Sequence, residues 1–219
     1  MQSVWILGDQ LSHWNSALVA AERRGQPVVL MIESKARGGH IRYHQQKLVL
    51  IYSAMRHFAE ELGRAGWEVD YHRLEETPTF EVAFRRHIAK YQPEGLLLAE
   101  PNDFLMAEVA RKVGRKFRLG IEFFPTSHFL LPREEFSAWA GTRQWLVMEL
   151  HYREMRKRTG YLMEADKRPT GGAWNFDFAN RHTFREWEKA GRPRSRKAVR
   201  EEPDAITLEV IAMVEREFA

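Results

Sequence analysis

Five short apolar runs, each separated from the next by a longer segment of mixed polarity, constrain this chain more than any other feature. The runs occupy residues 4–7, 27–32, 67–74, 95–100 and 121–124. Most of them are rich in Val, Ile and Leu and lack regular polar alternation, which is typical of strands covered on both faces. We therefore predict five buried β-strands that pair in parallel.

Helical periodicity fills the intervals between the runs. Within residues 45–62 the apolar side chains recur at steps of three and four, which forms one stripe of Leu48, Ile51, Met55, Phe58, Ala59 and Leu62. Shorter stripes are formed by Phe80, Phe84 and Ile88, and by Leu105, Val109 and Val113. Parallel neighbours require crossover connections. The alternation therefore predicts an α/β fold over residues 1–130, a Rossmann-like doubly wound five-stranded parallel sheet.

The pattern changes after residue 130. We predict helices over residues 133–140 and 145–159, an extended strap over residues 165–197, where Pro and Gly interrupt any period, and a final helix after Pro203. Residues 131–219 are therefore expected to form a connector of helices and extended chain. Its expected inward-facing side chains are Met148, Tyr152, Met155, Trp174, Phe176 and Phe178.

Composition excludes several classes of function. The 219 residues contain no cysteine, which excludes disulfides, a thiolate nucleophile and a cysteine-ligated iron-sulfur cluster within this chain. No apolar run approaches the roughly 18 residues of a membrane helix, and the start lacks the profile of a secretory signal. We therefore expect a cytoplasmic protein with no membrane partner.

Positive charge is concentrated late in the chain. The net charge is only +4, but residues 181–200 carry eight cations against two acids. Clustered cations neutralise phosphates. We therefore expect weak nucleic-acid binding through this segment, with Arg192, Arg194, Arg196 and Lys197 as the candidate DNA-binding residues.

The first chemical constellation is GDQLS, residues 8–12, immediately after the first apolar run. In a doubly wound sheet, ligands bind outside the carboxyl ends of the strands. Gly8 would let a ligand approach the backbone, and Asp9 and Gln10 offer an acceptor and an amide for the edge of a heterocycle. The alternative is that Asp9 only caps a turn or a helix.

Two further features carry alternatives that the residues leave open. His40 and His44 stand at a spacing that metal sites use, but two ligands do not make a site, so we interpret them as polar residues near a helix start and predict no metal site. Lys47 either reaches the crevice or is solvated. The cationic block over residues 149–163 contacts nucleic acid or serves as scaffold, and scaffold is the preferred interpretation.

Three segments together resemble a known family. ILGDQLS (residues 6–12), SAMRHFAEEL (residues 53–62) and the aromatic and arginine-rich stretch over residues 129–181 closely resemble the amino-terminal part of the iron-sulfur bacterial cryptochromes and photolyases. These are the deoxyribodipyrimidine photolyase-related proteins, and the resemblance covers essentially all of the chain. It implies a (6-4) photolyase-type lyase for DNA repair, or a cryptochrome photoreceptor.

The resemblance also implies where the cofactors lie. Family members are longer, and the half that holds FAD and the cysteine-ligated 4Fe-4S cluster would begin about where this chain stops. We therefore expect no catalytic residues here, no activity of this chain alone, and a flavin domain in cis as its partner. The absence of a glycine-flanked serine, a Walker motif and a G-x-G-x-x-G fingerprint agrees with that expectation.

For this part of the family, the resemblance implies an antenna chromophore, 6,7-dimethyl-8-ribityllumazine, near the loops after the first two strands. Carried over by position, the candidate binding residues are Gly8, Asp9, Gln10, Leu11, Ile32 and Glu33. One departure concerns Arg37, because family members often carry an acid a few residues beyond Glu33. A cation there reverses the charge and the hydrogen-bond sense, so a related chromophore is an alternative. The other reading is a freestanding nucleotide- or small-molecule-binding module that uses the same crevice.

Overall fold

A computed structural model describes residues 1–77, 79–177, 181, 183–191 and 201–219. Five parallel strands form one sheet in the order β3-β2-β1-β4-β5, which confirms the predicted α/β fold. The strands are β1 Gln2–Ile6, β2 Val28–Ile32, β3 Val69–His72, β4 Gly95–Ala99 and β5 Gly120–Phe124. Strand order reverses between β1 and β4, so the carboxyl end of β1 lies where ligands bind in folds of this class.

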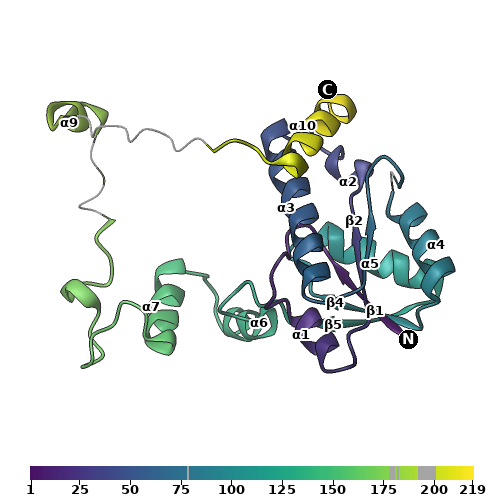
Figure 1. Cartoon of the computed structure of the whole chain (residues 1–219). Helices are drawn as coiled ribbons and strands as arrows, with labels where there is room; N and C mark the ends of the chain where they lie inside the picture. Colours follow the sequence, from purple (N-terminus) through teal and green to yellow (C-terminus); the bar gives the residue numbers. More distant parts are fainter. Residues whose placement is uncertain (78, 178–180, 182, 192–200) are drawn as a thin grey trace. The chain divides into compact units, whose positions relative to one another are not determined.

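Helices cover both faces of the sheet (Figure 1). They are α1 Ser16–Glu22, α2 Lys35–Gly38, α3 Gln45–Arg64, α4 Phe80–Tyr91, α5 Phe104–Phe117 and α10 Ala205–Glu217. One core joins alternate side chains of the sheet, such as Val4, to α1, α3 and α10. The other joins the intervening side chains, such as Trp5, to α4 and α5. The period of two along β1 therefore supplies both cores at once.

Local sequence sets where these helices begin. Asn15, Ser34, Thr79, Asp103 and Asp204 each precede a helix and accept hydrogen bonds from its first backbone N–H groups. These donors have no partner inside the helix, so a short polar side chain at this position stabilises the helix by about 1 kcal/mol.

The unit that contains the sheet is built from two separate stretches of the chain. Met1–Pro132 and Glu202–Ala219 form one compact unit, and Arg133–Glu201 forms another. The expected connector includes all of residues 131–219, but α10 packs on α3 through the buried residues Val210, Met213 and Val214. The compact units therefore divide after Pro132, and Glu202–Ala219 belongs with the sheet and not with the connector.

The second unit contains α6 Arg133–Gly141, α7 Met148–Thr159, the short 3-10 helix Thr170–Gly172 and α9 Phe184–Lys189. Its described part has one buried side chain, Arg156, whose guanidinium donates to the carbonyl oxygens of Trp174 (3.0 Å) and Leu162. The expected inward position of three side chains is wrong, because Met148, Phe176 and Tyr152 are 75%, 49% and 38% exposed. Phe178 lies outside the described residues.

The cationic helix α7 is held by contacts within its own unit. Arg153 pairs with Glu149 at 2.9 Å, and Arg153, Arg156 and Lys157 lie over the ring of Trp174. These contacts favour the scaffold interpretation of the block. No helix in the described ranges is long and apolar enough to cross a bilayer.

Candidate functional site

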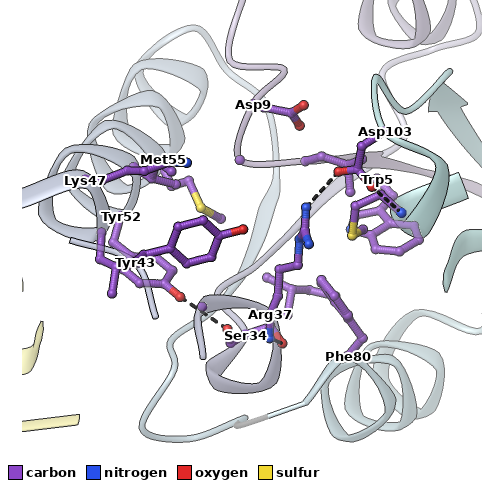
Figure 2. Close-up of a pocket in the computed structure, with 17 residues that line it drawn as sticks. Trp5, Asp9, Ser34, Arg37, Tyr43, Lys47, Tyr52, Met55, Phe80 and Asp103 are labelled. Carbon is purple, nitrogen blue, oxygen red and sulfur yellow. Dashed lines mark hydrogen bonds and ion pairs between the residues drawn. The ribbon is translucent and has the colours of Figure 1, made fainter. Parts of the chain in front are cut away.

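A cavity of about 260 Å³ opens outside the carboxyl ends of β1 and β2 (Figure 2). Its apolar lining comes from both strands and from α3, α4 and α5: Trp5, Leu7, Ile32, Leu48, Ile51, Met55, Phe80 and Met106. Trp5 and Phe80 meet edge to face, with ring centroids 5.5 Å apart. The lining therefore offers aromatic and thioether surfaces suited to a flat, apolar ring.

Polar side chains surround this apolar part. They are Asp9, Ser34, Arg37, Tyr43, Lys47, Tyr52 and Asp103. The Arg37 guanidinium donates to Asp103 Oδ2 at 2.7 Å, and Asp103 Oδ1 caps α5 by accepting from the N–H of Met106 at 2.8 Å. The charge of Arg37 is therefore balanced by an acid at the start of α5.

Lys47 and Asp9 carry the other two charges of the cavity lining. The Lys47 ammonium lies 4.4 Å from the centre of the Tyr43 ring and has no carboxylate partner among the residues that the structure describes. Asp9 accepts one hydrogen bond, from Asn102 Nδ2 at 3.3 Å. Both groups therefore retain hydrogen-bonding capacity for a ligand.

Two glycines allow the walls of the cavity to lie close to each other. A Cβ at Gly8 would lie 2.9 Å from Met55 Sδ, and one at Gly38 would overlap the Tyr52 hydroxyl. Tyr52 donates to the carbonyl oxygen of Ser34 at 3.2 Å, and its burial raises its pKa well above the ordinary value. Tyr52 is therefore a neutral hydrogen-bond donor that ties α3 to the end of β2.

Three of the six expected chromophore-binding residues line the cavity, namely Gly8, Asp9 and Ile32. Gln10 is buried, and its amide Nε2 donates to the carbonyl oxygens of Ala99 (3.0 Å) and Glu100 (3.1 Å) at the end of β4. Leu11 packs against the core beneath α3 and α10. These two residues hold the loop in place, outside the cavity lining.

Glu33 also lies away from the cavity lining, in a buried polar network. Its Oε1 accepts from Arg56 Nε at 2.7 Å and from the Tyr71 hydroxyl at 2.6 Å. Its Oε2 accepts from Arg56 Nη2 at 3.1 Å and from the N–H of Leu74 at 2.9 Å. Both carboxylate oxygens are therefore engaged by the protein.

The remaining candidates are placed as follows. His44 caps α3 by accepting from the N–H of Gln46, and His40 contacts Arg37, which agrees with the interpretation of this pair as polar residues near a helix start. Tyr43, Phe80 and Asp103 line the cavity but were missed, because no local pattern links their segments to the first strand. Arg192, Arg194, Arg196 and Lys197 lie outside the described residues.

Comparison with known proteins places the chain among relatives. The family model of the deoxyribodipyrimidine photo-lyase-related proteins matches residues 4–219. A (6-4) photolyase of Agrobacterium fabrum is 36% identical over 220 residues, which cover 99% of this chain and 42% of that protein. An uncharacterised protein of Acanthamoeba polyphaga mimivirus is 24% identical over 148 residues, 66% of this chain and 74% of that protein. This chain therefore spans less than half the length of the (6-4) photolyase, and it belongs to the deoxyribodipyrimidine photolyase-related protein family.

Proposed function

We propose that this chain is the antenna-chromophore-binding part of a photolyase-related protein that uses light for DNA repair or signalling. The cavity at the carboxyl ends of β1 and β2 is the observation that carries the proposal, because it lies where doubly wound folds bind ligands. In this proposal, FAD and the 4Fe-4S cluster belong to the part of the longer relatives that this chain does not span.

The lining fits 6,7-dimethyl-8-ribityllumazine or a related chromophore. Cavities for small molecules are mostly apolar, with a few polar groups that fix orientation, and they begin at roughly 300 Å³. A cavity of about 260 Å³ is near that lower limit, which favours a compact bicyclic ring over a full dinucleotide. Such a chromophore, when bound, absorbs light and passes the excitation to a flavin.

The protein's own residues have separate tasks in this proposal. Trp5, Phe80 and Met55 provide the apolar surface for the ring and exclude water from it. Asp9 accepts from an N–H or O–H group of the ligand, while Tyr43 and Lys47 serve its polar tail. The ion pair of Arg37 with Asp103 keeps the Arg37 charge compensated, so that the ligand does not have to be an anion.

Fluorescence titration of the purified chain tests the proposal. We expect saturable binding of 6,7-dimethyl-8-ribityllumazine, with riboflavin as the comparison ligand. Asp9→Asn keeps the size of the side chain but removes the charged acceptor, so affinity should fall about tenfold, equivalent to about 1.4 kcal/mol. Asp166→Asn, at an exposed acid in the second unit, is the matched control and should bind as the unmodified chain does.

Two results would count against the chromophore. One is no saturable binding of the lumazine or of riboflavin by folded protein. The other is equal affinity in the unmodified chain and in Asp9→Asn, which would remove Asp9 from the site.

A nucleotide-binding module is the second candidate, and Lys47 is the observation that favours it. An ammonium without a carboxylate partner among the described residues is available for a phosphate. If the ligand is a nucleotide, ATP should bind more tightly than the lumazine, and Lys47→Gln should weaken ATP binding at least about tenfold. If the ligand is the lumazine, Lys47→Gln should have a smaller effect than Asp9→Asn.

A further inference from the structure

Three potential metal ligands meet beneath α4, outside the cavity lining. Asp70 and His72 lie on β3, and His87 lies on α4. Asp70 Oδ2 is 2.9 Å from His72 Nε2 and 2.6 Å from His87 Nδ1. One carboxylate oxygen is therefore shared by two imidazoles that reach it from different elements.

The alternation of β3 creates this convergence. Val69 and Tyr71 pack toward the core beneath α3 and α10, so Asp70 and His72 point to the opposite face, toward α4. The His87 side chain is fully buried, and the side chains of His72 and Asp70 are 8% and 13% exposed. Water is therefore largely excluded from the cluster, yet the carboxylate retains an edge open to solvent.

The charge of the cluster favours a cation. The Asp70 carboxylate faces both imidazoles, and one ligand atom from each of the three residues lies within 4.8 Å of the others. The second oxygen, Oδ1, has no hydrogen-bond partner among the described residues. With neutral imidazoles, the cluster holds one largely buried negative charge. The Lys90 ammonium interacts with Asp70 through space, and a cation bound directly to the carboxylate would compensate the charge more fully.

Ser3 completes the arrangement behind His87. Its Oγ lies 2.9 Å from His87 Nε2, so Ser, His and Asp follow one another as in a nucleophilic triad. Ser3 is fully buried on β1, however, and no substrate can reach it there. Its chemistry is that of an outer partner, because metal-binding imidazoles usually donate their second ring N–H to an acceptor that fixes the tautomer.

We propose that Asp70, His72 and His87 form a divalent transition-metal site, with Zn²⁺ as the best-suited ion. Two imidazole nitrogens and one carboxylate oxygen form a donor set that zinc uses with a fourth ligand such as water. Ligands at about 2.0–2.1 Å in a tetrahedron lie about 3.3 Å apart. The present separations of 2.6 and 2.9 Å must therefore open by roughly half an ångström. Without metal, one N–H hydrogen of each imidazole lies between its ring and Asp70. The ion takes the place of these two hydrogens. Each hydrogen moves to the other nitrogen of its own ring.

The site would attach α4 to the sheet. Phe84 lies one turn before His87 and meets Trp5 edge to face at 4.8 Å, while Phe80, at the start of the helix, lines the cavity. Metal binding at His87 therefore fixes the helix that supplies one cavity wall. The inference stands independently of the ligand proposed for that cavity.

Isothermal titration of the tag-free, EDTA-treated full chain with Zn²⁺ tests the site. We expect one ion per chain and a rise in the thermal midpoint. His72→Gln is the decisive variant, because the glutamine amide can still donate to Asp70 but is a poor zinc ligand. Its zinc affinity should fall at least about 100-fold, since loss of even an outer partner costs 10- to 100-fold.

His57→Gln is the matched control. His57 also contacts a carboxylate, that of Asp204 at 2.6 Å, but no second imidazole joins that pair in the described chain. The control should bind zinc as the unmodified protein does. The proposal is overturned if the unmodified chain shows no stoichiometric binding, or if folded His72→Gln binds zinc with unchanged affinity.

Discussion

Glu33 shows how completely one side chain can be committed to the fold. Its carboxylate accepts four hydrogen bonds, from Arg56, Tyr71 and the backbone of Leu74. Arg56 also lies 3.1 Å from Glu209 on α10. A buried ion pair of this kind joins elements that are far apart in the chain. Removing one member leaves the other charge buried without a partner, which strongly destabilises the fold.

We therefore expect Glu33→Gln to lower the free energy of unfolding by about 3–5 kcal/mol. Urea denaturation followed by circular dichroism measures it. Glu60→Gln, at an exposed residue paired with Arg64 four positions later, should change stability very little. A loss for Glu33→Gln no larger than that of Glu60→Gln would show that the network contributes little.

At the scale of single residues, the position of the cavity could be predicted in part. The direction in which each side chain points could not be predicted. The end of the first strand was identified correctly as lining a crevice, because topology alone places it there. At the end of β2 and just beyond it, Ile32 and Ser34 line the cavity, whereas Glu33 between them points to α3. The candidate binding residues were transferred by sequence position alone, so they include Glu33 although its side chain points away from the cavity. The convergence of Asp70 and His72 with His87 had no local signal, because α4 must be placed on β3 before the three meet.

The helix α10 is held at its first turn by a titratable pair. The hydrogen bond with Asp204 raises the pKa of His57 above its ordinary value. Backbone and side-chain hydrogen bonds, the first of them from Thr207, lower the pKa of Asp204 to about 2. The contribution of His57 is thus fully present below its unfolded pKa and is lost as the pH rises through the raised value. The contribution of Asp204 is present above its unfolded pKa and is lost as the pH falls toward 2.

The pair should therefore stabilise the protein most between about pH 4 and pH 6.5. We expect the difference in unfolding free energy between the unmodified chain and His57→Gln to be largest there and to shrink above about pH 7. Urea denaturation at a series of pH values measures this difference. A difference that grows as the pH rises would contradict the assigned direction of the His57 pKa.

At the level of elements, the apolar periodicity predicted helices and strands but not which surfaces pack against each other. All five strands lie within a few residues of their predicted bounds, and the predicted apolar stripes fall on α3, α4 and α5, because each of these elements carries its own apolar pattern. The short helices α1 and α2 were not predicted. The apolar face of α10 was also visible, but the pattern does not say which body it covers. Its partner is α3, with His57 and Asp204 separated by 147 positions, and a Pro- and Gly-containing stretch precedes α10 in the chain.

Across the whole molecule, the most cationic stretch of the sequence belongs to the second unit. Residues 181–200 carry eight cations against two acids and lie entirely within this unit. We expect weak, sequence-independent DNA binding that is measurable near 50 mM salt and nearly absent by about 200 mM, because counterion release drives it. Fluorescence anisotropy with a labelled duplex measures this dependence.

Replacing Arg192, Arg194, Arg196 and Lys197 together by alanine should remove most of that binding. A matched control replaces four cations elsewhere, at Arg111, Lys112, Arg115 and Lys116 on α5, and should retain most of it. Binding that persists at high salt, or that survives the first replacement, would assign the contact to other cations, such as Arg153 and Lys157 on α7.

The first unit is formed by two separate stretches of the sequence, and this affects how it folds during synthesis. The ribosome releases Met1–Pro132 long before Glu202–Ala219 exists, so the face of α3 that receives Val210, Met213 and Val214 has no cover during that interval. Contacts between such distant segments form late and slowly. Exposed apolar surface on an incomplete chain is where aggregation begins and where chaperones bind. We therefore expect the newly made protein to depend on chaperone protection until α10 docks on α3.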